Sequence, residues 1–118
     1  MLITEKLKQQ AIARAGENPP VHPGKILKSD FLGPFQIRQH RLALLIDVPP
    51  QRIHEIIYGL RGITADTALR LEAFFHVDAS FWMTLQAEYE LARARLKFSA
   101  PTEEIEQFWL SDEADFEE

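Results

Sequence analysis

The sequence predicts an all-α fold, in which five helices surround one core between an N-terminal arm at residues 1–20 and an acidic tail at residues 98–118. Three observations support this prediction. Apolar residues recur three and four apart in five segments between residues 21 and 97. Residues that start or stop helices, such as Thr, Asp, Pro and Gly, stand at the ends of these segments. No segment alternates apolar and polar residues over a length that would make a useful strand.

Residues 1–20 are weakly amphipathic and finish in a stretch at residues 16–20 whose glycine and prolines break a helix. We therefore interpret them as an arm or a short helix outside the core. The first core helix begins at Pro23, because the fixed φ of proline suits a first helical turn. Gly33 and Pro34 are expected to end it. Its apolar residues are Ile26, Leu27, Phe31 and Leu32.

The second and third core helices are short and lie on either side of a tight turn. The apolar face of the second is formed by Leu42, Ala43, Leu45 and Ile46. Residues 47–50, Asp-Val-Pro-Pro, interrupt this face, so the turn lies there. The third helix begins at Pro49 or Pro50 and ends at Gly59, because glycine suits the left-handed position after a helix. Its buried residues are expected to be Ile53, Ile56 and Ile57.

The fourth and fifth helices each follow a residue that can cap them. Thr64 is expected to cap the fourth helix, and Asp66 in its first turn complements the helix dipole. Its core face is Ala68, Leu69, Leu71, Ala73, and Phe74 or Phe75. Asp78 is expected to cap the fifth helix, which extends to about Lys97. The apolar stripe of the fifth helix is Phe81, Trp82, Leu85, Tyr89, Leu91 or Ala92, and Leu96.

The composition is that of an ordinary globular protein, with 46% hydrophobic and 26% charged residues among 118. No apolar run approaches the ~20 residues needed to cross a bilayer, so we expect no contact with a membrane. Residues 1–6 lack the features of a secretory signal, which favours a cytoplasmic location. The absence of cysteine excludes disulfides, a thiolate nucleophile and a zinc site built on cysteine.

The net charge of -5 is distributed unevenly along the chain. Residues 98–118 hold eight acidic residues and no basic one, which leaves residues 1–97 at +3. Four arginines fall between residues 37 and 64, against Asp47 and Glu55. This asymmetry indicates either separate partners for the body and the tail or a tail that only keeps the protein in solution.

The second and third helices with their turn form a helix-turn-helix, the arrangement that places a recognition helix in the major groove of DNA. Gln51 and Arg52 open the third helix, where side chains reach base edges; arginine pairs with guanine and glutamine with adenine. Glu55 can accept from cytosine, although an intrahelical pair with Arg52 is favoured. The candidate base contacts are therefore Gln51, Arg52, His54 and Glu55.

Phosphate contacts need basic or amide side chains beside the recognition helix, or backbone N–H groups at a helix start. The candidates are Arg38, Gln39, Arg41, Arg61 and Thr64. The alternative for all these residues is an ordinary solvated surface.

Several motifs occur in order along residues 22–95. They are residues 22–27 (HPGKIL), 41–43 (RLA), 48–56 (VPPQRIHEI), 61–71 (RGITADTALRL) and 81–86 (FWMTLQ). Together they resemble the HigA family of antitoxins. The resemblance implies a five-helix fold of the Cro/lambda-repressor type that binds double-stranded operator DNA as a homodimer and represses its own operon. It also implies a HigB-like toxin partner that cleaves mRNA.

The chain departs from the family pattern at four positions. Arg38 stands where a capping Ser is usual, and Asp47 where the turn usually has Gly. Because Asp tolerates the left-handed conformation better than most residues, we expect the turn to survive. His54 replaces a common Asn, which weakens the case for a base contact there. Leu44 replaces a residue that is often polar, and is either an exposed apolar residue or part of a contact surface.

An enzyme is not indicated. Paired carboxylates occur only in the tail, no glycine-rich phosphate loop is present, and the serines lack a matching histidine and aspartate. The four histidines never pair four apart on one helix, so neither a metal nor another cofactor is expected. Two alternatives to the antitoxin repressor stay open: an antitoxin or adaptor that binds protein but not DNA, and a repressor that acts without a toxin.

The acidic tail and the fifth helix are the candidates for protein contacts. Apolar residues interleave with carboxylates in the tail, a composition typical of segments that stay disordered until a partner is present; they are Ile105, Phe108, Trp109 and Leu110. The tail or the arm docks on a basic toxin surface in one hypothesis, and the tail only solubilises the chain in the other. The dimer contact is assigned to the fifth helix.

Overall fold

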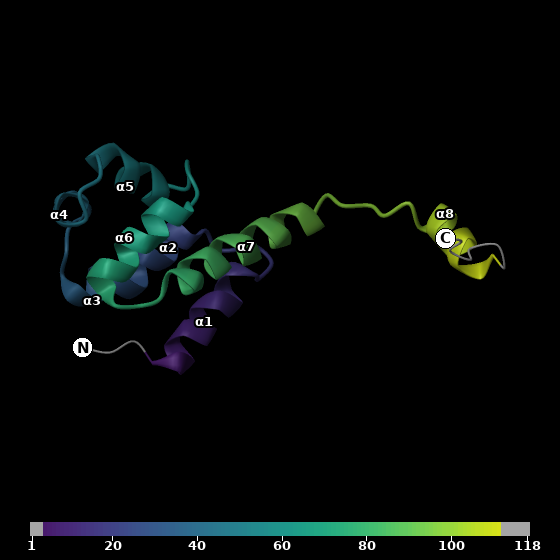
Figure 1. Ribbon diagram of the computed structural model, residues 1–118, viewed down its shortest axis with the longest axis horizontal. Helices are drawn as coiled ribbons and strands as arrows, with labels where there is room; N and C mark the ends of the chain where they lie inside the picture. The colour runs from purple at the N-terminus through teal and green to yellow at the C-terminus, as the bar shows by residue number, and fades with distance from the viewer. Residues whose placement is uncertain (1–3, 112–118) are drawn as a thin grey trace, which may run out of the picture.

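The computed structural model describes residues 4–111, and this part of the chain is entirely helical (Figure 1). Its elements are α1 (Glu5–Ala15), α2 (Pro23–Ile26), the π-helical segment η1 (Leu27–Leu32), α3 (Gly33–Phe35), α4 (Gln39–Leu45), α5 (Pro50–Ile57), α6 (Ala65–Phe75), α7 (Ala79–Arg95) and α8 (Thr102–Leu110). The predicted all-α class is therefore confirmed. No helix among these residues is long and apolar enough to span a membrane.

The predicted first core helix forms, but it does not end at Gly33 and Pro34. α2, η1 and α3 run on without a break, and the chain turns at Gln36, whose φ is 57°. The N–H of Gly33 donates to the carbonyl of Lys28, five residues back, so the helix widens just before Pro34. This wider π turn lets the helix continue through a proline, which has no N–H and would crowd the carbonyl of a regular α-helix.

The turn between α4 and α5 forms as expected. Asp47 adopts the left-handed conformation, with φ of 61°, which its short polar side chain tolerates as expected. The N–H of Val48 donates to the carbonyl of Ala43 at 3.0 Å, which satisfies a carbonyl at the end of α4. Gly59, with φ of 75°, ends α5 in the same way. The short helix pair therefore has the tight, defined connection that a helix-turn-helix needs.

The predicted caps of the two longer helices are confirmed. The hydroxyl oxygen of Thr64 accepts from the N–H of Thr67 at 3.4 Å at the start of α6. The carboxylate of Asp78 accepts from the N–H of Phe81 at 3.1 Å at the start of α7. Each cap satisfies a backbone donor that the first helical turn leaves free.

The core lies between α1, α2–η1, α4, α5, α6 and α7, and Trp82 is one of its fully buried residues. The Trp82 ring is fully buried, with ring centroids 4.6 Å from Phe31 and 5.0 Å from Phe81. Burying each such side chain contributes roughly 1.5–3 kcal/mol, and each aromatic pair about 0.5–1.5 kcal/mol more. These side chains belong to the same buried cluster as Leu42 of α4 and Ile53 of α5.

Several residues predicted to face the core point outward instead. Leu45, Leu69 and Leu96 are 47–59% exposed, and Ala73 is also exposed, whereas of the two alternatives Leu91 and Ala92 it is Ala92 that is buried. In each helix the core takes the neighbouring positions three and four apart, which leaves these residues on the outer side. The periodicity of the sequence identifies the helices correctly but assigns too many residues of each helix to its buried face.

The N-terminal segment is part of the core, contrary to the expectation of an arm outside it. Thr4 caps α1 by accepting from the N–H of Leu7 at 3.2 Å. Ala11 and Ala15, four residues apart, are buried where α1 packs along α7. An ion pair between Arg14 and Asp30, 2.7 Å long, joins α1 to η1. Alanines give a weak hydrophobic signal, although their small size is what lets two helices approach closely.

The C-terminal segment forms α8, which Figure 1 shows apart from the other helices. Every residue from 93 to 111 is exposed. The tail was expected to stay disordered until a partner is present, and the structure instead has a helix over Thr102–Leu110. The last acidic residues, 112–118, and residues 1–3 lie outside the described part of the chain.

Candidate nucleic-acid interface

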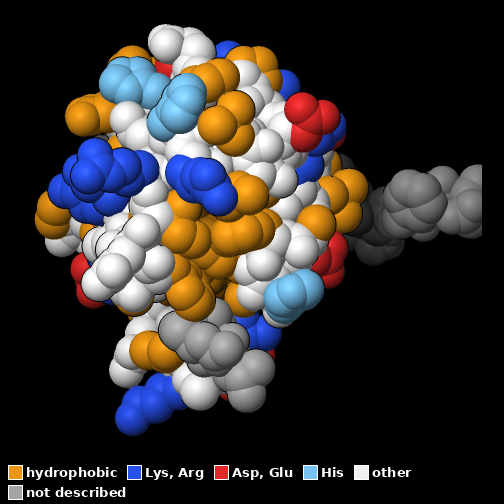
Figure 2. Space-filling view, turned by 90° about the vertical axis from the view of Figure 1, so that its left-hand side faces the viewer, with side chains coloured by type: hydrophobic (Ala, Val, Ile, Leu, Met, Phe, Trp, Pro, Cys, Tyr) orange, Lys and Arg blue, Asp and Glu red, His pale blue; other side chains and the backbone are white. Residues whose placement is uncertain are grey.

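The helix α5 presents one polar face outward and packs its other face on the core. Ile53 and Ile56 are fully buried, whereas Gln51 and His54 are exposed and Arg52 and Glu55 are partly exposed. Figure 2 views the end of the molecule that carries α4 and α5, where basic and histidine side chains gather beside a hydrophobic band. The four predicted base contacts therefore all come from the outer side of one helix.

Glu55 joins two of the predicted DNA contacts. Its carboxylate accepts from the guanidinium of Arg61 at 2.8 Å and from the side-chain amide of Gln51 at 3.2 Å. These hydrogen bonds, from Gln51 first and then Arg61, hold the pKa of Glu55 below its ordinary value, so the side chain is ionised. The predicted pair of Glu55 with Arg52 is wrong, because Arg52 is drawn instead to a carboxylate on the next helix.

Arg52 donates to Asp66, in the first turn of α6, at 2.8 Å. Arg70 donates to the same carboxylate at 3.0 Å, and the two arginines, Arg70 first, hold the pKa of Asp66 below its ordinary value. Only one guanidinium nitrogen of Arg52 donates to Asp66. Since arginine has five donor hydrogens in a planar fork, the remaining edge is free to meet a guanine.

Arg70 is a structural residue that the sequence analysis missed. Its guanidinium donates to the backbone carbonyls of Ile46 at 2.9 Å and Asp47 at 3.1 Å, so it holds the turn of the helix-turn-helix from outside. The spacing of Asp66 and Arg70, four apart on one helix, was the one available signal that these side chains act together.

The start of α4 lies beside the exposed face of α5. Nε2 of Gln39 is 3.5 Å from Nδ1 of His54, and the His54 ring lies 4.6 Å from that of Tyr58. A shallow hollow of about 240 Å³ lies between the two helices, lined by Gln39, His40, Pro50, Gln51 and His54. A base edge could therefore approach Gln51 and Gln39 together.

The remaining phosphate candidates are spread around this face. Arg38 and Arg41 are exposed at the start of α4, and Arg38 gives α4 no side-chain cap, as expected of an Arg in place of Ser. Thr64 is exposed, but its hydroxyl is used to cap α6. Leu44, on the same helix as Arg41, is an exposed apolar residue.

Gly24 lets α2 approach the end of α5 more closely than any side chain would allow. A Cβ on Gly24 would lie 1.7 Å from the carbonyl oxygen of Ile56. His22 fixes this contact, because its Nδ1 accepts from the N–H of Gly24 at 2.8 Å while its ring packs 4.8 Å from that of Tyr89. The motif at residues 22–24 thus sets the position of α5, a role that only the packing of the helices reveals.

Burial lowers the pKa of His22, and the charge of Arg93 lowers it further. The neutral ring that results is the form whose Nδ1 can accept the Gly24 hydrogen bond. The loop between α5 and α6 is held by a second polar contact. The buried Gln86 side chain accepts from the N–H of Ile63 at 2.8 Å.

A short helix pair joined by a left-handed turn and packed on the other helices of the core, with a polar first turn on its second helix, defines a helix-turn-helix regulator. No protein-family model matches the chain. Virulence-associated protein I of Dichelobacter nodosus is 48% identical over 82 residues, which are 68% of this chain and 76% of that protein. Two solved structures narrow the assignment from this class of regulator to one family.

The Pseudomonas aeruginosa antitoxin HigA, solved with the higBA promoter, is 41% identical, with a TM-score of 0.65 over 75% of this chain and 92% of that one. An addiction module antidote protein of the HigA family from Coxiella burnetii is 38% identical, with a TM-score of 0.63 over 75% and 92%. The chain belongs to the HigA family of antitoxins. The family comprises antitoxins and regulators rather than enzymes, in agreement with the sequence analysis.

Proposed function

We propose that this antitoxin binds operator DNA of its own operon through α5 and represses that operon. The observation that carries the proposal is the first turn of α5, where Gln51 and Arg52 stand outward on a helix whose other face is fully buried. A helix held this firmly presents its side chains in a defined register to the major groove, which is wide enough for one helix.

Arg52 is the principal base reader in this proposal. Asp66 orients the guanidinium and leaves one edge free for the two acceptors of a guanine. Gln51 reads adenine through both atoms of its amide, so its amide nitrogen leaves Glu55 on binding. Glu55 keeps its bond to Arg61, and His54 completes the face beside Gln39.

Contacts to phosphate position the helix without reading sequence. Arg38, Gln39 and Arg41 supply them at the start of α4. Arg61 and Thr64 supply them from the loop before α6 and from the start of that helix. The support is the position of these residues around α5 and the exposure of all but Gln39, which is half-buried.

We further propose that the protein acts as a homodimer through α7. Two recognition helices then enter successive major grooves about 34 Å apart on a palindromic operator and occlude the promoter. Leu91 near the end of α7 and Leu96 just beyond it are 47% and 59% exposed, which supports an apolar contact there. A HigB-like toxin that cleaves mRNA is the proposed protein partner, in keeping with membership of the family.

The test is a mobility shift on the upstream DNA of the operon and on random DNA at physiological salt. Arg52→Ala should weaken operator binding by roughly 1–3 kcal/mol and leave binding to random DNA nearly unchanged. Arg38→Ala should weaken both alike, since it contacts only phosphate. Lys6→Ala, which removes one exposed positive charge on α1, is the matched control and should change neither.

Two outcomes would contradict the proposal. Equal losses on both DNAs for Arg52→Ala and Arg38→Ala would remove α5 as the recognition helix. Failure of the unaltered protein to bind either DNA would leave an antitoxin that acts only through protein contacts.

A further inference from the structure

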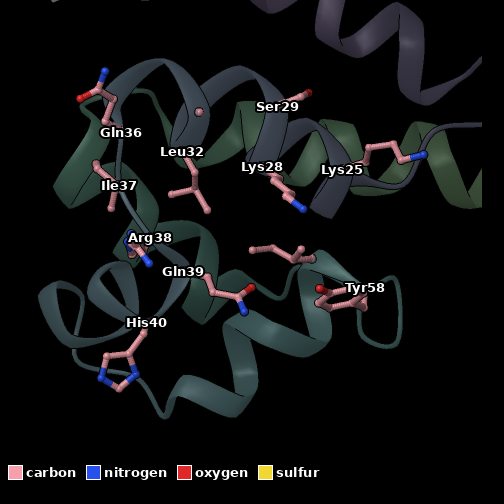
Figure 3. Close-up of a pocket in the computed structure, with 12 residues that line it drawn as sticks. Lys25, Lys28, Ser29, Leu32, Gln36, Ile37, Arg38, Gln39, His40 and Tyr58 are labelled. Atoms are coloured by element: carbon pink, nitrogen blue, oxygen red, sulfur yellow. The ribbon is translucent and has the colours of Figure 1, made fainter.

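An open groove of about 1000 Å³ runs beside the helix-turn-helix, between α2–η1–α3 on one side and α4 and α5 on the other. Figure 3 shows Lys28 and Leu32 extending from the upper helix toward Gln39 and Tyr58 on the other side. The groove has an apolar floor and a basic rim. The floor includes Leu32, Ile37 and Ile57, and the rim includes Lys25, Lys28 and Arg38. None of the described residues that line it is acidic.

The helix α8 has the complementary composition. Ile105, Phe108 and Trp109 lie three and four apart on one face, and the rings of Phe108 and Trp109 pack 4.9 Å apart. All three side chains are exposed, Trp109 by 74%. Three glutamates lie elsewhere on the helix, at Glu103, Glu104 and Glu106.

A helix of this length needs a surface to stabilise it. α8 has nine residues, whereas isolated helices shorter than ~12–15 residues are marginal in water. Burying each large side chain would contribute roughly 1.5–3 kcal/mol, and the exposed apolar face of α8 lacks this stabilisation. The groove, with its apolar floor and basic rim, can bury the apolar face of α8 and place positive charges beside its glutamates.

We propose that α8 docks in this groove of its own chain. Ile105, Phe108 and Trp109 lie on the apolar floor, and the glutamates face the lysines and Arg38 on the rim. The contact joins complementary charges, so it weakens as salt is added.

The connecting segment is long enough for this contact. His22, which precedes α2, packs against Tyr89 of α7, so the near end of the groove at Lys25 lies beside α7. From Tyr89 the helix runs six residues to Arg95, about 9 Å. Residues 96–101 can then span about 20 Å back toward Lys25. A tether this short gives an effective concentration in the millimolar range, so even weak docking is well populated.

Docking covers part of the candidate nucleic-acid interface, because Arg38, Gln39 and His40 line the groove as well. This consequence, unlike the docking itself, rests on the proposed function. A tail docked for about nine-tenths of the time would lower the apparent DNA affinity roughly tenfold, since only the undocked fraction binds. The acidic tail then acts as an internal competitor of the phosphate backbone.

The docking is tested by attaching a nitroxide spin label to the full chain and measuring how it broadens the NMR signals of the backbone amides. The protein has no cysteine, so Gln107→Cys gives a single labelling position, on the side of α8 away from Phe108 and Trp109. We expect broadening of the amide signals of Leu32, Ile37 and Tyr58. Lys28→Glu in the labelled protein should abolish the broadening, and Lys6→Glu, exposed on α1, should preserve it.

Three results would overturn the docking. They are broadening confined to residues next to α8 in sequence, broadening centred on another face, and broadening that Lys28→Glu leaves intact. Spin-labelled chains mixed with isotope-labelled chains that carry no spin label reveal broadening between molecules. Broadening seen only in this mixture would show that α8 docks in the groove of a second copy, which contradicts the proposal.

The competition is tested separately on DNA. Phe108→Ser combined with Trp109→Ser should tighten operator binding about tenfold, with Leu110→Ser as the control off the docking face. Unchanged affinity would overturn the competition. The spin-label result does not depend on DNA, so a failure of the proposed function and a failure of docking are distinguishable.

Discussion

Gly24→Ala should destabilise the protein far more than the addition of one methyl group suggests. The new Cβ would lie 1.7 Å from the carbonyl oxygen of Ile56 and 2.5 Å from its carbonyl carbon, whereas real Cβ atoms do not approach within 3.0 Å. Both contacts are with backbone, which cannot swing aside. The substitution therefore forces α2 and α5 apart by more than about 1 Å, the difference between these distances.

The cost follows from what lies between those helices. Ile26 of α2 and Ile53 of α5 are fully buried in the core cluster that these helices share, and a gap of about 0.5–1 Å forfeits a quarter to a half of a dispersion contact. Overpacked cores lose about 1–3 kcal/mol and sometimes more. We expect Gly24→Ala to lower the free energy of unfolding by about 3 kcal/mol and the Tm by roughly 10 °C.

The assay is urea and thermal unfolding followed by circular dichroism, with Gly16→Ala as the matched control. Gly16 has φ of -95°, and its Cβ would meet a carboxylate oxygen of Glu88, which can move, so we expect a change within about 0.5 kcal/mol. A loss below about 1 kcal/mol for Gly24→Ala, or equal losses for both variants, would refute the close backbone contact as a determinant of the fold.

Three further predictions concern the turn between α4 and α5, the arginine that supports it, and the histidine that caps α2. Asp47→Gly should raise the free energy of unfolding by about 0.5 kcal/mol. Glycine relieves ~1–2 kcal/mol of left-handed strain in the folded state, which exceeds the ~0.5–1 kcal/mol lost to the greater entropy of the unfolded chain. A lower urea midpoint would contradict this. Arg70→Ala should cost about 1–2 kcal/mol by releasing the two turn carbonyls, and a melting temperature equal to that of Lys6→Ala, exposed on α1, would argue against that role. The folded pKa of His22 is lowered, so its contribution to stability is present above pH 6.5 and is lost as the pH falls through the folded pKa. His22→Asn, which keeps a cap acceptor, should reduce the change in the free energy of unfolding between pH 7 and pH 5. An unchanged pH dependence would show that His22 is not its cause.

The helix order could be predicted because its signals are local. The caps at Thr64 and Asp78 and the stop at Gly59 each depend on neighbouring residues and the preferences of their backbone. The same holds for Asp47, whose short polar side chain tolerates the left-handed conformation. Such features need no knowledge of the tertiary structure.

The pairings within the candidate site could not be predicted from the sequence. Arg52 and Asp66 are 14 residues apart on two helices, and their contact depends on the angle at which α5 meets α6. Helical periodicity identifies the exposed side of each helix but not the neighbour that faces it. For the same reason Glu55 was assigned to Arg52, the nearest arginine along the helix, rather than to Arg61.

In the proposed function, where Arg52 reads a base of the operator, the carboxylate of Asp66 limits which residues can replace Arg52. A neutral reader such as Gln or Asn would leave Asp66 with Arg70, an ion pair that already exists. An acidic reader of cytosine would instead bring a second carboxylate toward Asp66, which already holds Arg52 at 2.8 Å, and like charges so close are unfavourable. On the proposed role of Arg52, the base that it reads can therefore change from guanine to adenine while Asp66 stays, whereas a change to cytosine requires that Asp66 change first.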